Sequence, residues 1–222
     1  MPIRAVAFDV DGTLYPNAAM YLRSAPFVLL RLRLMRAFAA VRREIRKRRP
    51  IDDLRTMEAQ MLAERLGVSE REARERIDKE IYGLWEQVLD GVSPYPYVKD
   101  CIQGIKDAGL PIAVTSDFPV GRKLARLGLD GLFDCQMWTE EAGYLKPHPE
   151  SFHMIAECLG VPPEQILYVG NSYEYDVVGA KKAGLYAAHR VRRPVTDTIA
   201  DFTFSDYRDL QRWIHERKAT VS

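Results

Sequence analysis

Residues 3–14 read IRAVAFDVDGTL, an apolar run followed by two aspartates, a glycine and a threonine. The run 3–8 is too short for a helix and is bounded by a turn residue, Gly12, which predicts a buried strand. Asp9 and Asp11 then follow the carboxyl end of that strand. Side chains two residues apart point to the same side of an extended chain, so both carboxylates can address one phosphate or one metal ion. A lone DxDG fragment is also common in surface turns, so other residues must decide between the two interpretations.

Short apolar runs recur along the chain and alternate with helical patterns. The predicted strands after 3–8 are 110–115, 135–138, 166–169 and 186–191, and the predicted helices are 98–108, 119–127, 149–159 and 173–183. Strands that alternate with helices form a parallel sheet covered on both faces. We therefore expect an α/β fold with a Rossmann-like, doubly wound parallel sheet. A last short strand and a helix are expected within 202–218.

Residues 17–92 interrupt this alternation, because they show helical spacing without any strand signal. Pro50 separates a first helical segment from a second. Ser69 and Glu72 have the spacing of a capping box, which predicts the start of a helix that runs to about residue 89. We therefore expect an inserted all-helical domain. The predicted domains are 1–16 with 93–222 as the core and 17–92 as the insertion.

The composition excludes several classes of protein. The chain has 222 residues, a formal net charge of +1, 47% hydrophobic and 28% charged residues, which indicates a soluble globular protein. No apolar run approaches the roughly 18 residues of a membrane-spanning helix, and the N-terminus lacks a secretory pattern. Cys101, Cys135 and Cys158 are odd in number and widely spaced, which argues against disulfides and predicts thiols in a reducing compartment. We expect a cytoplasmic protein.

A basic segment lies within the predicted insertion. Residues 17–50 hold ten Lys or Arg against one acidic residue, and 26–49 mix these cations with apolar residues. We expect a helix with one packed face and one solvated arginine face. Two alternatives stay open: some arginines contact an anionic substrate beneath the insertion, or the helix docks on an anionic membrane, which we do not expect. The segment lacks interleaved aromatic residues, so no nucleic-acid partner is predicted.

Polar residues follow the other predicted strands at the same edge of the sheet, where ligands bind in doubly wound folds. They are Thr115, Ser116 and Asp117 after the second strand, Lys146 before the helix at 149–159, and Asn171 and Asp176 after the fourth strand. Asp9, Asn171 and Asp176 would supply the oxygen ligands that Mg²⁺ prefers. The simpler interpretations are a helix cap for the first group and a solvated side chain for Lys146.

Taken in order, four segments resemble the motifs of the haloacid dehalogenase-like superfamily, in its phosphatase branch. They are DVDGTL at 9–14, the strand ending at Thr115, Lys146 in KPHPESF, and GNSYEYD at 170–176. The position of 17–92 between the first two motifs is similar to that of the family's helical cap. The resemblance implies a Mg²⁺-dependent phosphatase that hydrolyses a small phosphorylated metabolite through an aspartyl-phosphate.

The resemblance also implies a role for each motif residue. Asp9 would be the nucleophile, and Asp11 would protonate the leaving group and then activate water. Thr115 and the backbone N–H of Ser116 would bind the phosphoryl group, whose charge Lys146 would offset. The implied metal ligands are a carboxylate oxygen of Asp9, the backbone carbonyl of Asp11, and the side chains of the last motif, Asn171 and Asp176. Because Asp11 lies beside another carboxylate, we expect its pKa to be raised.

Asn171 departs from the family pattern, in which an acid most often follows the glycine of the last motif. An amide oxygen still coordinates Mg²⁺ but carries no charge, so we expect weaker metal affinity unless Glu174 or Asp176 compensates, with metal dependence retained. Two alternatives stay open, a phosphomutase of the same fold and a catalytically weakened binding or regulatory protein. Asp11 argues against halide release, which requires no acid there. The sequence does not determine the substrate or the oligomeric state.

Overall fold

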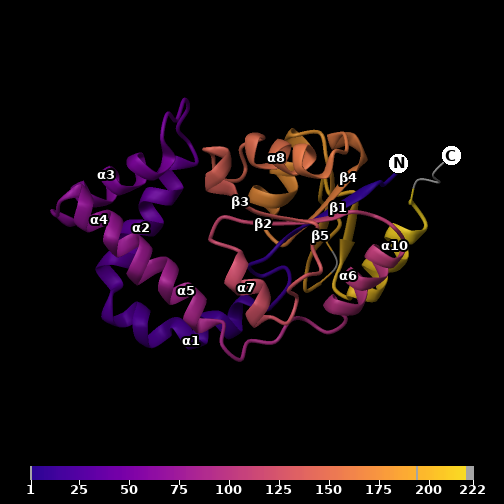
Figure 1. Cartoon of the computed structure of the whole chain (residues 1–222), viewed down its shortest axis with the longest axis horizontal. Helices are drawn as coiled ribbons and strands as arrows, with labels where there is room; N and C mark the ends of the chain where they lie inside the picture. Colours follow the sequence, from indigo (N-terminus) through magenta and orange to yellow (C-terminus); the bar gives the residue numbers. More distant parts are fainter. Residues whose placement is uncertain (1, 194, 219–222) are drawn as a thin grey trace.

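In the computed structural model of the chain, a six-stranded parallel sheet has the order β3-β2-β1-β4-β5-β6 (Figure 1). The structure describes residues 2–193 and 195–218, apart from the side chains of 84–86. The strands are β1 (Ala5–Asp9), β2 (Ile112–Ser116), β3 (Cys135–Trp138), β4 (Ile166–Gly170), β5 (Tyr186–Arg190) and β6 (Phe202–Phe204). Each of the first five lies within two residues of its predicted limits, which confirms the predicted doubly wound α/β fold.

Strand β1 lies at the point where the strand order reverses. Its five residues are all buried, as expected for a short apolar run covered on both faces. It pairs in parallel with β2, where Asp9 is opposite Thr115, and with β4, where Phe8 is opposite Val169. In doubly wound sheets this switch point forms the ligand crevice, and Asp9 is the last residue of the strand that ends there.

The alternation of side chains along β1 builds two apolar layers. Val6 and Phe8 pack on one face of the sheet, and Ala5 and Ala7 on the other. The first face is covered by α6 (Val98–Asp107), α7 (Gly121–Arg126) and α10 (Tyr207–His215), and the second by α8 (Glu150–Leu159), η4 (Tyr173–Val178) and α9 (Gly179–Lys182) (Figure 1). Two short turns, η2 (Thr139–Ala142) and η3 (Pro163–Gln165), follow β3 and precede β4.

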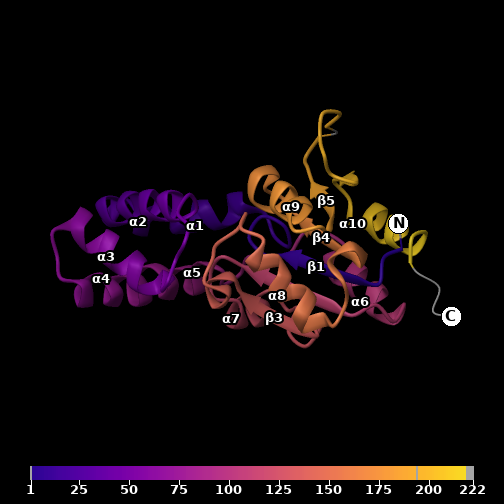
Figure 2. The ribbon, with the colours of Figure 1, turned by 90° about the horizontal axis from the view of Figure 1, so that it is seen from above.

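The inserted helices stand beyond the carboxyl ends of the strands, as Figures 1 and 2 show. They are α1 (Asn17–Leu30), α2 (Leu32–Ile45), α3 (Leu54–Leu66), α4 (Glu70–Arg76), η1 (Ile77–Tyr82) and α5 (Gly83–Val88). The Ser69 hydroxyl accepts a hydrogen bond from the backbone N–H of Glu72, which confirms the predicted helix start. A separate apolar cluster that includes Phe38, Leu62 and Ile81 holds α2, α3, α4 and η1 together, whereas Met20 of α1 and Val88 of α5 pack in the core of the sheet domain. No helix in the described residues is long and apolar enough to span a bilayer.

The cysteine prediction was wrong for two of the three residues. Cys135 of β3 and Cys158 of α8 form a disulfide with Cα atoms 6.3 Å apart, whereas Cys101 is a buried free thiol. Packing of α8 against β3 brings together two cysteines that are 23 residues apart in the chain. Spacing along the sequence could not show this contact, and the argument from free thiols to a reducing compartment no longer stands.

Candidate active site

Five of the predicted site residues line one cavity of about 240 Å³ at the carboxyl ends of the strands. They are Asp9, Asp11, Lys146, Asn171 and Asp176. The inserted helices contribute Asn17, Met20 and Tyr21 of α1 and Arg46, which follows α2. The cavity therefore lies between the sheet edge and the insertion, and residues as far apart in the chain as Asp9 and Asp176 share it.

Lys146 is buried between two carboxylates. Its Nζ donates to Asp9 Oδ1 and to Asp176 Oδ1, each at 2.7 Å, and lies 3.1 Å from Tyr168 Oη. Only 4% of the residue is exposed, so a solvated lysine is excluded. Burial raises the pKa of Asp9 to about 7, although the Lys146 ammonium acts in the opposite direction and Asp176 adds to the rise.

The second carboxylate oxygen of Asp9 faces the loop that follows β1. Thr13 Oγ1 lies 2.7 Å from Asp9 Oδ2 and 3.1 Å from Asn171 Oδ1, so one hydroxyl links the first and last motifs. Gly12 has a φ of +88°, and a Cβ there would lie 2.4 and 2.6 Å from the amide nitrogens of Asn17 and Asn171. Only glycine allows this close approach of the loop to the site.

Asp176 holds the loop after β4 in place. Its Oδ2 accepts hydrogen bonds from the backbone N–H groups of Asn171 at 3.1 Å and Ser172 at 2.9 Å, while Oδ1 accepts from Lys146. Both oxygens are thus engaged within the protein. Asp176 therefore orients the backbone of Asn171 and the ammonium group of Lys146.

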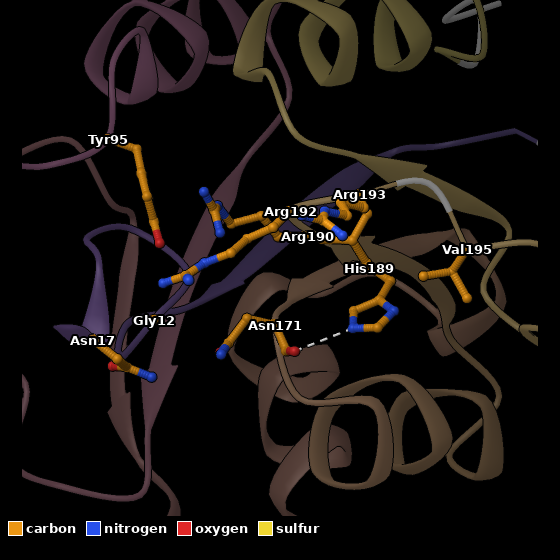
Figure 3. Close-up of a pocket in the computed structure, with 10 residues that line it drawn as sticks. Gly12, Asn17, Tyr95, Asn171, His189, Arg190, Arg192, Arg193 and Val195 are labelled. Atoms are coloured by element: carbon orange, nitrogen blue, oxygen red, sulfur yellow. Dashed lines mark hydrogen bonds between the residues drawn. The ribbon is translucent and has the colours of Figure 1, made fainter.

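Asn171 also borders a second cavity of about 330 Å³ (Figure 3). Its backbone oxygen lies 3.1 Å from His189 Nε2. The side chains of Arg190, Arg192 and Arg193 line this space, and no carboxylate among the described residues does. The catalytic cavity and this basic cavity share two lining residues, Asn17 and Asn171. Three arginine side chains therefore place positive charge beside the candidate active site.

The prediction of a raised pKa for Asp11 was wrong. Burial alone would raise it, but the Lys123 ammonium and hydrogen bonds from Lys123, Ser116 and Tyr15 outweigh burial and hold the pKa of Asp11 below its ordinary value. Lys123 Nζ and Ser116 Oγ each donate to Asp11 Oδ2 at 2.6 Å, and the Tyr15 hydroxyl donates to Oδ1. The neighbouring carboxylate of Asp9 has less influence than these donors.

Sequence reasoning missed Lys123, whose side chain is 1% exposed. A lysine within a predicted helix is normally solvated, and nothing in the spacing of 119–127 distinguishes it. Thr115 is fully buried and does not line the cavity, and its hydroxyl has no hydrogen-bond partner among the described residues. A buried hydroxyl without a partner is costly, but this one does not face the cavity in the structure.

The basic segment reaches the core through two arginines. Arg42 is 4% exposed and donates to Glu58 at 2.9 Å, to Glu140 and to the backbone oxygen of Asp117. The expectation of a solvated arginine face is therefore wrong for Arg42. It is also wrong for Arg46, whose side chain is 14% exposed.

Arg46 Nε donates to the backbone oxygen of Lys146 at 2.9 Å, and Nη2 pairs with the carboxylate of Asp117. The guanidinium also lies over the ring of Tyr175, 4.5 Å from its centroid. Burial alone would raise the pKa of Asp117, but Arg46, Lys146 and Arg42 hold it well below its usual value. The insertion and the core are thus joined by buried ion pairs.

The donor set at the cavity suits a hard cation. Asp9 and Asn171 present oxygen atoms to the same Thr13 hydroxyl, and Asp11 follows two residues after Asp9. No group of three or more His, Cys, Asp or Glu side chains gathers in metal-binding geometry within the described residues. Mg²⁺ typically binds through one or two carboxylates and keeps several waters, so this sparse, all-oxygen set fits it.

Comparison with known proteins places the chain in a family. The sequence model of the haloacid dehalogenase-like hydrolases matches residues 3–184. Glyceraldehyde 3-phosphate phosphatase of Methanopyrus kandleri is 29% identical, with 96% of this chain and 98% of that protein covered. Phosphoglycolate phosphatase of Haemophilus influenzae is 26% identical, with 93% and 96% covered.

A solved structure shows the same fold. The L-2-haloacid dehalogenase from Xanthobacter autotrophicus with chloropropionic acid covalently bound superposes with a TM-score of 0.67 at 22% identity, covering 96% of this chain and 98% of that chain. The family match spans all four motifs and the insertion between the first two. The chain therefore belongs to the haloacid dehalogenase-like hydrolase family.

Proposed function

We propose that the protein is a Mg²⁺-dependent phosphatase that hydrolyses a phosphate monoester of a small metabolite through an aspartyl-phosphate on Asp9. The observation that carries this proposal is the buried arrangement around Asp9, which ends the central strand and contacts Lys146 and Thr13 through different oxygens. The two phosphatases that are similar over nearly the whole chain support phosphoester chemistry. We also propose that 17–92 act as a cap over the core formed by 1–16 and 93–222.

Asp9 is the proposed nucleophile because both its oxygens are held in place. One oxygen attacks phosphorus in line with the ester bond, the Asp9 O–P bond forms, and the bond from phosphorus to the leaving oxygen breaks. Lys146 offsets the negative charge where two anions meet. The unpartnered hydroxyl of Thr115 and the backbone N–H of Ser116 are the proposed donors to the phosphoryl oxygens.

Asp11 is the proposed acid and base. As a carboxylate with a lowered pKa it suits the second half-reaction, in which it takes a proton from the water that attacks the aspartyl-phosphate. For the first half-reaction it must carry a proton to the leaving oxygen. The arrival of a dianionic phosphate raises the pKa of a neighbouring carboxyl, which favours that protonated form.

The carboxylate of Asp9, the backbone carbonyl of Asp11 and the amide oxygen of Asn171 are the proposed Mg²⁺ ligands. Bound there, the metal would neutralise charge on the phosphoryl oxygens. We propose that Asp176 acts on this site by orienting Asn171 and Lys146, because it accepts hydrogen bonds from both residues. Asn171 lacks the charge of a carboxylate, and this favours a catalytically weakened binding protein as the second candidate.

The test is phosphate release from p-nitrophenyl phosphate with Mg²⁺ and with a chelator. Activity is expected with Mg²⁺ only, and Asp9→Asn should reduce it at least a thousandfold. Asp52→Asn, the same change at an exposed position outside the cavity, should have no effect. Substantial activity in Asp9→Asn would exclude the aspartyl-phosphate. An inactive native protein that gains activity on Asn171→Asp would support the second candidate.

A further inference from the structure

A third cavity, of about 440 Å³, lies beneath the inserted helices and continues from the catalytic cavity. We call it the cap chamber. Four residues line both spaces, namely Tyr21, Arg46, Phe118 and Tyr175. A group bonded to a phosphate beside Asp9 would pass between these four side chains into the cap chamber. The chamber is thus positioned to receive the leaving group of a phosphate monoester.

The walls of the cap chamber are predominantly apolar. Val28 of α1, Met35, Phe38 and Ala39 of α2, and Ile81 of η1 line its interior. Phe118 and Tyr175 add aromatic rings where the chamber joins the catalytic cavity. Apolar side chains and ring faces bind apolar and aromatic groups by excluding water and by ring stacking. A cavity of this size would remain largely unfilled by a leaving group of two or three carbons.

Two of the arginines in the chamber wall, Arg42 and Arg46, do not make it a site for a second anion. Arg42 is buried and bonded to Glu58, Glu140 and the Asp117 carbonyl, and Arg46 is paired with the Asp117 carboxylate. Their positive charge is already balanced, and an anion would have to displace buried carboxylates to reach them. Arg43 also lines the chamber but is exposed to solvent. The interior therefore discriminates by apolar contact and shape.

We propose that the cap chamber binds an aromatic leaving group, so that the preferred substrates are phosphate monoesters of aromatic alcohols. This inference rests on the proposed phosphatase function and adds the substrate class to it. An aromatic substrate would also distinguish this chain from the two phosphatases that are similar to it, whose names refer to small, polar phosphoesters. Catalysis itself depends on the residues around Asp9, and the chamber contributes binding of the alcohol.

The first experiment compares 1-naphthylmethyl phosphate with ethyl phosphate. Both have a primary alkoxide as leaving group, so a difference in rate reports recognition rather than chemical reactivity. We expect kcat/KM for 1-naphthylmethyl phosphate to be at least tenfold higher, mainly through a lower KM. If both are hydrolysed with equal kcat/KM, the aromatic preference is wrong while the phosphatase function stands.

The second experiment fills the cap chamber. Ala39 is an exposed residue of α2 in the chamber lining, so Ala39→Phe adds a ring to the space without removing a core contact. The variant should lose most of the advantage that 1-naphthylmethyl phosphate has over ethyl phosphate in kcat/KM. Ala18→Phe, the same change at an exposed residue of α1 outside the lining, is the matched control. Retention of the preference in Ala39→Phe would overturn the inference.

A binding measurement keeps the two proposals separable if no turnover is seen. Calorimetry with 1-naphthylmethylphosphonate and ethylphosphonate, which are not hydrolysed, measures the chamber directly. We expect the first to bind at least tenfold more tightly to the native protein and to Ala18→Phe, and this ratio to approach one in Ala39→Phe. Equal binding of the two phosphonates to the native protein would exclude an aromatic site, whatever the activity.

Discussion

Lys123 Nζ lies 2.6 Å from Asp11 Oδ2, and only 1% of the lysine side chain is exposed. A buried ammonium thus neutralises the carboxylate that we propose as acid and base. Ser116, at the end of the neighbouring strand, shares both partners, with its hydroxyl 2.6 Å from Asp11 and 3.2 Å from Lys123. The three groups join the loop after β1, the end of β2 and helix α7 at one point.

Replacement of Lys123 by Met should destabilise the protein by about 3 kcal/mol or more at pH 7, because it leaves a mostly buried carboxylate without its cation. Since the folded pKa of Asp11 is depressed, its pairing stabilises the protein above the unfolded pKa of 3.8 and is lost as pH falls through the folded value. Urea unfolding of the variant and the native protein measures the loss. The double variant Asp11→Asn/Lys123→Met should recover most of it, and strict additivity of the two changes would contradict the pairing.

Asp9→Asn should stabilise the metal-free protein above pH 7. The folded state retains the Asp9 proton up to about pH 7, whereas the unfolded chain releases it near 3.8. The unfolded state binds fewer protons in this window, so the native free energy of unfolding decreases as pH rises through it. Unfolding of both proteins in chelator should show a gain on the order of 1–2 kcal/mol for the variant at pH 8 and a smaller one at pH 5. A gain that does not grow with pH would contradict this account.

The buried cluster between insertion and core contains one arginine and two glutamates. Arg42→Met should cost about 3–5 kcal/mol, because Glu58 is then buried without a cation and Glu140 keeps only the partly exposed Arg55, 3.7 Å away. Thermal or urea unfolding at pH 7.5 measures this change. Arg36→Met, at an exposed position of the same helix, is the control and should leave stability nearly unchanged.

Glu140→Gln should stabilise the folded protein at high pH, whereas Arg42→Met should destabilise it. Burial raises the pKa of Glu140 to about 7, against the effect of Arg42, so its ionisation above that pH weakens the folded state. The variant should therefore gain stability relative to the native protein as pH rises from 5 to 8. Unfolding midpoints across that range provide the test, and a loss that increases with pH would contradict the prediction.

Asn171→Asp should increase the apparent affinity for Mg²⁺ about tenfold, because a carboxylate replaces a neutral amide among the proposed ligands. Activity measured against Mg²⁺ concentration gives the half-saturation value for each protein. Unchanged half-saturation would remove Asn171 from the metal site.

The basic cavity beside Asn171 should attract anionic substrates. Arg193→Gln is expected to reduce kcat/KM two- to fivefold at low ionic strength, with the difference disappearing near 0.5 M salt, because exposed charges are screened over roughly 10 Å at 0.1 M. Arg4→Gln, an exposed arginine just before β1 at the opposite end of that strand, is the control. A difference that persists at high salt would indicate direct contact with the substrate.

Sequence patterns alone predicted the fold class, the strands and five of the residues that line the candidate active site. Short apolar runs such as 166–169 that alternate with helical patterns predict the buried strands of a parallel sheet, and polar residues at their carboxyl ends then meet at one edge. The motif order added the expected roles of Asp9 and Lys146. These inferences depend on patterns among neighbouring residues and on the order of strands and helices, and both can be recognised in a single sequence.

Only the tertiary structure decided the partners of those residues. The depressed pKa of Asp11 arises from Lys123, which lies on a different element and has the sequence pattern of a surface lysine. The Cys135–Cys158 disulfide and the burial of Arg42 likewise depend on which elements pack together. Electrostatic and covalent partners are chosen by distance in space, and contacts between segments far apart in the chain leave no periodic signal in one sequence.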